Sequence, residues 1–446
     1  MQVTETTAAG LKREYRVVVP ATDLEAKVNE RLDELKGRVQ LRGFRPGKVP
    51  VAHLKRLYGK SAMAEAIEAA VREANSKIIT DHGFKLATEP KVVLPSEEGA
   101  VDGVIEGKAD LAYTVELEIV PPITLADFKT VRLTRLTAEV TDAEIDQSLQ
   151  TIAEQYRPFV TKTEGAANGD RATIGFEGSI DGGPFEGGSG EDVPLMLGAG
   201  RFIPGFEDHI VGLKPGESTT FNVKFPDDYQ TASLAGKEAT FAVTVKAVDA
   251  PGAITVDDEF AKTLGLESLT KLKEAVKERI SREHAMASRH KLKRALLDQL
   301  DERHKFEPPP SLVEREFANI WSQIEKDMAR EKRTFADEGT TEEKAREEYQ
   351  AIAERRVRLG LVIAEIGERN NIRVTEDQLT AAMIERARQY PGQEKTVVDH
   401  YRKTPGALET LRAPLFEDKV VDFLVELAKV TEKPVSRDEL FKEDEE

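Results

Sequence analysis

The sequence predicts a multidomain α+β protein, with an α+β head, a small antiparallel β domain and extended all-α arms in that order. The chain has 446 residues, which is too long for one hydrophobic core and corresponds to about two to four domains. Residues 159–250 hold 15 of the 31 glycines, between short alternating apolar segments. From about residue 255 onward, apolar residues recur at helical spacing.

The composition excludes several classes of protein. Hydrophobic residues make up 39% of the chain and charged residues 33%, and no apolar run of about 18 residues predicts a membrane span. We expect no secretory signal. Cysteine is absent, which excludes disulfides and thiolate chemistry, and the 7 histidines are scattered, so we expect no metal and no cofactor. These features are typical of a bacterial-type cytoplasm.

The charge is unevenly distributed along the chain. The formal net charge of −17 disfavours general binding to nucleic acid. Residues 11–60 nevertheless carry 13 Lys and Arg against 6 Asp and Glu, whereas residues 159–250 carry 7 against 14. This contrast predicts one basic face that docks on an anionic surface.

The head is predicted to span residues 1–120. Residues 15–19 have the composition of a strand. Thr22 and Glu25 have the spacing of a capping box, which predicts a helix from there to about residue 40.

The second half of the head is predicted to repeat this alternation. Ser61 is expected to cap a second long helix that ends near Gly83. Residues 92–94 and, more clearly, 111–120 are expected to be strands.

A connecting segment, residues 121–158, leads from the head to the β domain. Pro121 and Pro122 end the last strand of the head. A helix is expected from Thr141 to about Tyr156.

The helical domain is predicted to span residues 251–436. Long helices are expected at about 267–304 and 340–369, and the prolines 308–310 forbid continuity after the first. Trp321 is expected to be buried.

Two further capping boxes are predicted in this domain. They begin at Thr340, with Glu343 three residues later, and at Thr375, with Gln378 three residues later. The charge-rich end of the chain, residues 437–446, is predicted to be a disordered acidic tail.

A basic loop, residues 42–50, follows the first predicted helix. Its three cations stand in seven residues without an acid, two glycines permit tight turns, and two prolines stiffen it. Phe44 lies between the cations. From these residues alone, a docking tip, a structural turn with solvated charges and a phosphate site at a helix N-terminus all remain open.

The loop is similar to the ribosome-docking signature of the bacterial trigger factor family, Gly-Phe-Arg-x-Gly-x-x-Pro, and every fixed position matches. The resemblance implies that the loop joins two helices at the tip of the head. It also implies docking beside the exit of the ribosomal tunnel, against a ribosomal protein and rRNA. Phe44, Arg45 and Lys48 are the expected contacts, and the whole predicted set is Arg42, Gly43, Phe44, Arg45, Pro46, Gly47, Lys48 and Pro50.

Residues 169–250 resemble the FKBP-type peptidyl-prolyl isomerase domain. The segments that carry the resemblance lie in order along the chain, at 169–178, 181–186, 197–206, 211–217 and 240–245. The resemblance implies an FKBP-like antiparallel β domain with a short helix, within predicted limits of 159–250.

Such a domain can isomerise proline without a nucleophile, metal or acid–base pair. Amide resonance creates a barrier of roughly 18–20 kcal/mol, which is crossed spontaneously in tens of seconds. The twisted transition state loses this resonance and its charge separation, so an apolar aromatic cavity favours it over the planar form.

The resemblance implies a pocket with Phe176 where many relatives have Tyr, and with Glu186 in place of the usual Asp. A pair that is usually Val-Ile falls on Phe202 and Ile203. Binding of small macrolides is therefore not expected, although activity on unfolded peptides is. The alternative is that these aromatics form an ordinary core. The implied catalytic residues are Phe176, Phe185, Glu186, Phe202, Ile203, Phe206, Tyr229 and Phe241.

The helical domain alone permits a compact bundle. The resemblance implies instead an open cradle of helical arms that holds unfolded nascent chains. It implies no DNA and no membrane as partners, and a homodimer away from the ribosome.

Three hypotheses of function follow from the sequence. The first is a ribosome-associated chaperone with isomerase activity, which accounts for the loop, the β domain and the arms together. The second is a free FKBP-type isomerase with helical dimerisation arms. The third is a non-enzymatic holdase or assembly scaffold.

Overall fold

The computed structural model divides into two compact units. The first unit contains residues 1–135 and 290–432, and the second contains residues 136–289 and 433–446. The structure describes all residues except 39–43, 45–48, 95–99, 227, 228, 230, 232, 338 and 443–446.

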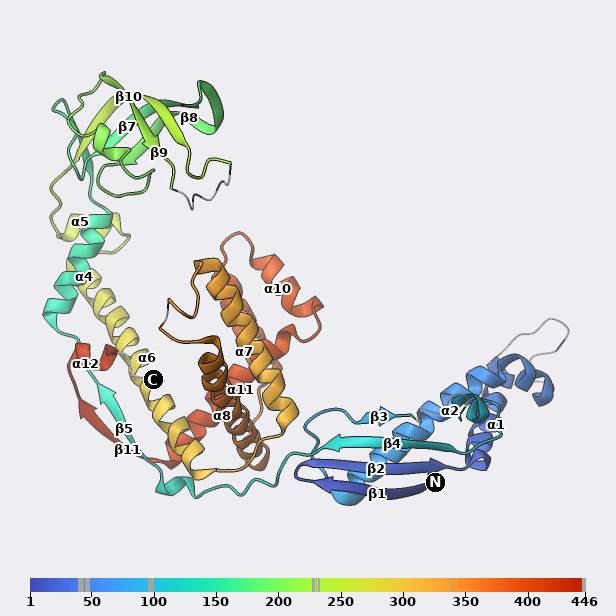
Figure 1. The fold of residues 1–446 in the computed structure, drawn as a ribbon. Coiled ribbons are helices and arrows are strands. Elements are labelled where there is room, and N and C mark those ends of the chain that lie inside the picture. Colours follow the sequence, from blue (N-terminus) through green and yellow to red (C-terminus); the bar gives the residue numbers. More distant parts are fainter. Residues whose placement is uncertain are drawn as a thin grey trace. The chain divides into compact units, whose positions relative to one another are not determined.

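The N-terminal part of the first unit is an antiparallel sheet covered by helices (Figure 1). The strand order is β1-β2-β4-β3. The sheet and its helices confirm the predicted α+β head. Their bounds are β1 Gln2–Ala9, β2 Lys12–Val19, β3 Lys91–Val93, β4 Leu111–Glu118, α1 Ala21–Arg38, α2 Val51–His82 and α3 Ala100–Ile105.

Alternation builds the core of this head. Tyr15, Val17 and Val19 lie at every second position of β2 and are at most 2% exposed. They pack with a face of α2 that contains the buried residues Ala66 and Ala70, one turn apart. The small side chains allow α2 to approach the sheet closely.

Two predicted helix starts in the head are wrong. Helix α1 begins at Ala21, so Thr22 lies inside the first turn. Helix α2 begins at Val51, directly after Pro50, and Ser61 is in its interior. Leu54, in the first turn of α2, is fully buried, and its burial in the core stabilises a helix that begins before Ser61. The predicted end is confirmed, because Gly83 is the left-handed C-cap of α2.

The remainder of the first unit is mostly helical. Buried residues of two helices, represented by Val362 and Val420, meet in one core with Leu296. Trp321 is 6% exposed, which confirms the prediction that it is buried. The bounds are η1 Phe128–Thr130, α7 Pro310–Glu331, α8 Glu342–Arg369, α9 Glu376–Arg388, α10 Glu394–Lys403 and α11 Ala407–Leu427.

A two-stranded sheet was not predicted in this region. Strand β11 (Lys429–Pro434) follows α11 and pairs with β5 (Arg132–Thr137). In β11 Val430 is partly buried and the other residues are exposed. The sequence of β11 therefore lacks the two-residue apolar period of a half-buried strand.

The second unit contains a five-stranded antiparallel sheet, the helices α4, α5 and α12 (Arg437–Phe441), and the first part of α6. The sheet order is β6-β10-β7-β8, and β9 pairs with β10. Helix α6 contributes its first part to this unit, where it packs with α4 and α5 in one apolar cluster. The bounds are β6 Phe159–Lys162, β7 Arg171–Ile180, β8 Gly183–Met196, β9 Ser218–Lys224, β10 Glu238–Pro251, η2 Glu207–His209, α4 Asp142–Gln155, α5 Asp258–Thr263 and α6 Leu269–Arg303.

The capping box predicted at Thr375 is confirmed, because both of its reciprocal hydrogen bonds are present. The helix expected from Thr141 is confirmed as α4, and the structure adds a capping box at Thr141. The box predicted at Thr340 is wrong by one residue. Thr341 is the N-cap of α8, and its hydroxyl accepts a hydrogen bond from the backbone N–H of Lys344.

The prediction that residues 437–446 are disordered is wrong for 437–441. These residues form the helix α12 (Arg437–Phe441), whose N-cap is Ser436. Leu440 is fully buried, which stabilises the helix against the body of the unit. Among the described residues, no helix is both long and apolar enough to cross a membrane.

Candidate functional site

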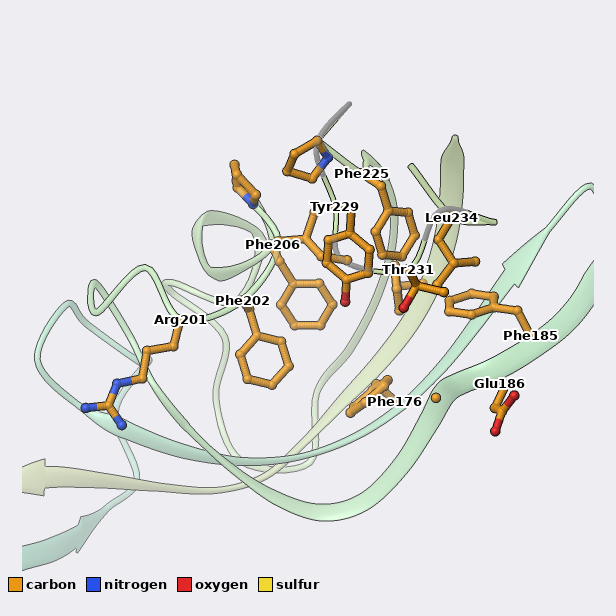
Figure 2. A pocket seen from close by; sticks show the side chains of 15 residues that line it. Phe176, Phe185, Glu186, Arg201, Phe202, Phe206, Phe225, Tyr229, Thr231 and Leu234 are labelled. Atoms are coloured by element: carbon orange, nitrogen blue, oxygen red, sulfur yellow. The ribbon is translucent and has the colours of Figure 1, made fainter. Parts of the chain in front are cut away.

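A cavity of about 560 Å³ opens in the β domain and is lined mainly by aromatic rings (Figure 2). It lies where β7, β8 and β10 meet the turn that precedes η2. The eight residues of the predicted catalytic set all line this one cavity. Residues from six separate stretches of sequence are therefore brought together.

Phe206 is at the centre of the ring cluster. It is 0% exposed, and its ring centroid lies 5.2 Å from that of Phe241 and 6.3 Å from that of Phe176, both edge to face. The ring of Phe202 stacks on it at 5.2 Å. Edge-to-face contacts are favourable for aromatic quadrupoles and hold the rings in fixed orientations.

Strand alternation positions Phe241. In β10, residues 239, 241, 243 and 245 are buried while the residues between them are exposed. Phe241 therefore points to the inner face of the sheet, where Phe185 meets it at 6.1 Å and 90°.

Three glycines leave room for these rings from the side of the sheet. A Cβ built on Gly178 would lie 2.6 Å from the ring of Phe241, and one on Gly190 would lie 2.8 Å from Phe176. A Cβ on Gly188 would lie 2.9 Å from the ring of Phe185. Real Cβ atoms do not approach so closely, so the rings require glycine at these three positions.

Two members of the predicted set lie at the rim. Tyr229 is 37% exposed, and its hydroxyl points into the cavity (Figure 2). Glu186 is exposed, and its carboxylate points away from the rings. Aromatic rings therefore form the inner part of the cavity, and the charged side chains of Glu186 and Arg201 lie where water reaches them.

The structure adds lining residues that the sequence prediction missed. Phe225 is fully buried, and its ring lies 5.9 Å from Phe185 and 4.7 Å from Tyr229. The alternation of Phe221, Val223 and Phe225 was the signal that could have found it. The others are Gly187, Arg201, Pro204, Pro226, Thr231 and Leu234.

This arrangement can bind an apolar side chain against the rings, together with the amide next to it. A planar amide is charge-separated and loses favourable hydration when it enters such a cavity. A twisted amide has less charge separation, so it loses less hydration. The chemistry that fits the cavity is rotation about an amide bond.

The predicted ribosome-binding loop is only partly described. Arg42, Gly43, Arg45, Pro46, Gly47 and Lys48 lie outside the described residues. Phe44 is 38% exposed, and its ring centroid lies 5.2 Å from that of His53 in α2. Pro50 directly precedes α2, with Val49 fully buried beside it. The end of the loop is therefore anchored in the head.

Three family models match successive parts of the chain. Residues 1–152 match "Bacterial trigger factor protein (TF)", and residues 268–426 match its C-terminal model. Residues 162–246, which contain the cavity, match "FKBP-type peptidyl-prolyl cis-trans isomerase".

Curated relatives match over the full length. The chain is 62% identical to the trigger factor of Azorhizobium caulinodans, 60% identical to that of Xanthobacter autotrophicus and 58% identical to that of Afipia carboxidovorans. Each match covers 100% of this chain and 99% of the relative.

One solved structure shows the same fold. It comes from work entitled "Promiscuous Substrate Recognition in Folding and Assembly Activities of the Trigger Factor Chaperone". The TM-score is 0.54 at 20% identity, and the match covers 96% of this chain and 99% of that one.

Proposed function

Because the chain belongs to the bacterial trigger factor family, we propose that its ring-lined cavity is where the isomerase activity resides. The protein is a ribosome-associated chaperone with an FKBP-type peptidyl-prolyl isomerase domain. The observation that supports the location is the convergence of Phe176, Phe206 and Phe241 on one apolar cavity.

In this proposal the rings act by shape and polarity. Phe206 and Phe241 form the floor against which the proline ring packs, and Phe202 and Tyr229 flank it. The apolar wall disfavours the planar, charge-separated amide more than the twisted one, so the barrier falls. Phe176 has no hydroxyl, so it supplies packing alone.

The test of the cavity is Phe241→Leu, which removes one ring and retains an apolar side chain at a buried position. We expect kcat/KM toward a prolyl peptide to fall about tenfold, which corresponds to about 1.4 kcal/mol in the barrier. The matched control is Phe159→Leu, because Phe159 lies in β6 under the guanidinium of Arg171 and outside the cavity. Equal activity in both variants would place the reaction elsewhere.

The ribosome and nascent chains are the partners of the family. We further propose that this chain docks through residues 42–50 beside the tunnel exit, against a ribosomal protein and rRNA. The exposure of Phe44 and the excess of Lys and Arg in residues 11–60 support this. Charge-assisted bonds from Arg45 and Lys48 would provide attraction to an anionic surface.

The test of docking is simultaneous replacement of Phe44, Arg45 and Lys48 by alanine, followed by co-sedimentation with ribosomes. We expect the bound fraction to fall to background at moderate salt, because both the apolar anchor and two cations are lost. Persistence of the variant in the ribosomal pellet would contradict the proposal.

A matched control for the docking test removes one exposed apolar side chain and two cations elsewhere. Ile384 is 43% exposed, and Lys395 and Arg402 are exposed on the neighbouring helix α10. Their simultaneous replacement by alanine changes the charge equally, and we expect this variant to pellet with ribosomes like the unchanged protein.

We also propose that the domain limits predicted from the sequence separate the parts of the chain that carry different functions. In this proposal the helical domain holds nascent chains in the cytoplasm. Exposed apolar side chains are dispersed over its helices and the turn after α9, including Ile352, Ile384 and Tyr390. Dispersed patches with polar surroundings bind unfolded chains weakly and release them. A homodimer away from the ribosome belongs to the same proposal.

A further inference from the structure

A buried carboxylate lies directly behind the cavity. Glu207 begins the short helix η2, next to Phe206, and is 8% exposed. It is not among the residues that line the cavity. A carboxylate that is shielded from water needs strong compensating partners, so its position requires an explanation.

The partners of Glu207 are backbone N–H groups of the segment before it. Oε2 accepts hydrogen bonds from the N–H of Gly198 at 2.8 Å and of Gly200 at 3.1 Å. Oε1 accepts from the N–H of Arg201 at 3.0 Å and, at the longer distance of 3.5 Å, from that of Phe202. One side chain thus satisfies four donors of an irregular loop.

These bonds also keep the carboxylate ionised. Burial by itself would raise the pKa of Glu207, but the backbone N–H groups of Gly200, Gly198, Phe202 and Arg201 outweigh it and hold the pKa below its ordinary value. Gly198 and Gly200 have φ of +85° and +63°, so the loop adopts a conformation that favours glycine. The hydrogen bonds to Glu207 stabilise this conformation.

The loop that Glu207 holds leads into the cavity lining. The last of these N–H groups belongs to Phe202 itself, Ile203 is the next residue, and Phe202 stacks on Phe206, the neighbour of Glu207. We propose that Glu207 is a positioning residue for the isomerase, which locks the loop 198–202 so that Phe202 and Ile203 face the proline. This inference rests on the proposed role of the cavity.

The chemistry selects glutamate for this role. Both carboxylate oxygens accept, and each is used. Glutamine has nearly the same shape, but one end of its amide is an NH₂ donor, which would face N–H donors in either orientation. Aspartate is one methylene shorter and cannot reach both sets of donors.

The test is Glu207→Gln, with Asp208→Asn as the matched control, because Asp208 is the adjacent acid and is exposed. We expect Glu207→Gln to lower kcat/KM toward a prolyl peptide by about tenfold or more. Hydrogen exchange should accelerate in residues 197–203 and remain unchanged in β10. We expect Asp208→Asn to match the unchanged protein in both measurements.

Two results would overturn the inference: unchanged kcat/KM in Glu207→Gln, or acceleration of exchange that is uniform over the whole domain. Should Glu207→Gln unfold the domain, Glu207→Asp replaces it with the same expected results. Phe241→Leu is measured in parallel. If it loses activity while Glu207→Gln does not, only the positioning role fails, and if both remain active, the proposed cavity fails first.

Discussion

Tyr113 is a buried tyrosine of the head, far from the cavity in sequence. It lies in β4, in the core of the head, and is 3% exposed. Among the described residues its hydroxyl has no hydrogen-bond partner. Burial raises the pKa of Tyr113 from 10.0 to about 12, because the charged form cannot be hydrated.

This shift predicts a pH dependence of stability. The folded head holds the proton of Tyr113 more tightly than the unfolded chain does. The free energy of unfolding is therefore at its full value with respect to this group below pH 10, and it falls as the pH rises toward 12. Tyr113→Phe removes this loss. We expect the free energy of unfolding of the variant, relative to the unchanged protein, to rise by about 2 kcal/mol across this interval.

Denaturant unfolding at several pH values checks this prediction. Tyr58→Phe is the matched control, because Tyr58 is only partly buried against the same core. A difference between Tyr113→Phe and the unchanged protein that does not vary with pH would refute the explanation by burial.

At the residue scale, the sequence predicted what depends on order along the chain. The eight predicted cavity residues stand at ordered positions among glycines, so the resemblance to the FKBP-type domain was enough to identify them. Glu207 and Phe225 were missed. The role of Glu207 depends on where four backbone N–H groups converge, which no local pattern of side chains encodes.

At the scale of elements, helix starts were predictable only where the cap and the apolar face agreed. Thr141 and Thr375 precede helices whose buried residues begin within the first turns. Ser61 has the cap chemistry but lies inside α2, because Leu54 and Val49 are fully buried earlier in the chain. Burial therefore overrides a cap signal that stands alone.

Close packing of helices gives a prediction at the same scale. A Cβ built on Gly367 in α8 would overlap the ring of Phe416 in α11, whereas nothing lies within 4 Å of a Cβ on Gly360 in the same helix. We expect Gly367→Ala to lower the free energy of unfolding by about 1–3 kcal/mol through overpacking. We expect Gly360→Ala to raise it by about 0.5–1 kcal/mol, because alanine is the better helix former.

Thermal or denaturant unfolding of the two glycine variants distinguishes packing from helix propensity. Both changes are the same in chemistry and lie in one helix, so only the neighbouring ring differs. Stabilisation by Gly367→Ala would mean that α8 and α11 do not pack closely at this point.

At the scale of the whole molecule, our proposal assigns to one chain a docking loop, an isomerase cavity and a surface for unfolded chains. The cavity lies in the second unit, whereas Phe44 and the dispersed apolar residues Ile352, Ile384 and Tyr390 belong to the first. The order of the domains was visible in composition, because glycine and helical periodicity change along the chain. Strand β11 and helix α12 were not predicted, since their stability comes from partners distant in sequence.

The central claim is that isomerisation occurs in the cavity, separately from the holding of unfolded chains. The most direct measurement compares Phe241→Leu with the unchanged protein in two assays on the same preparation: kcat/KM toward a prolyl peptide, and suppression of the aggregation of an unfolded protein. We predict that the first falls about tenfold while the second is unchanged. A parallel loss of both, or full isomerase activity in the variant, would contradict the account.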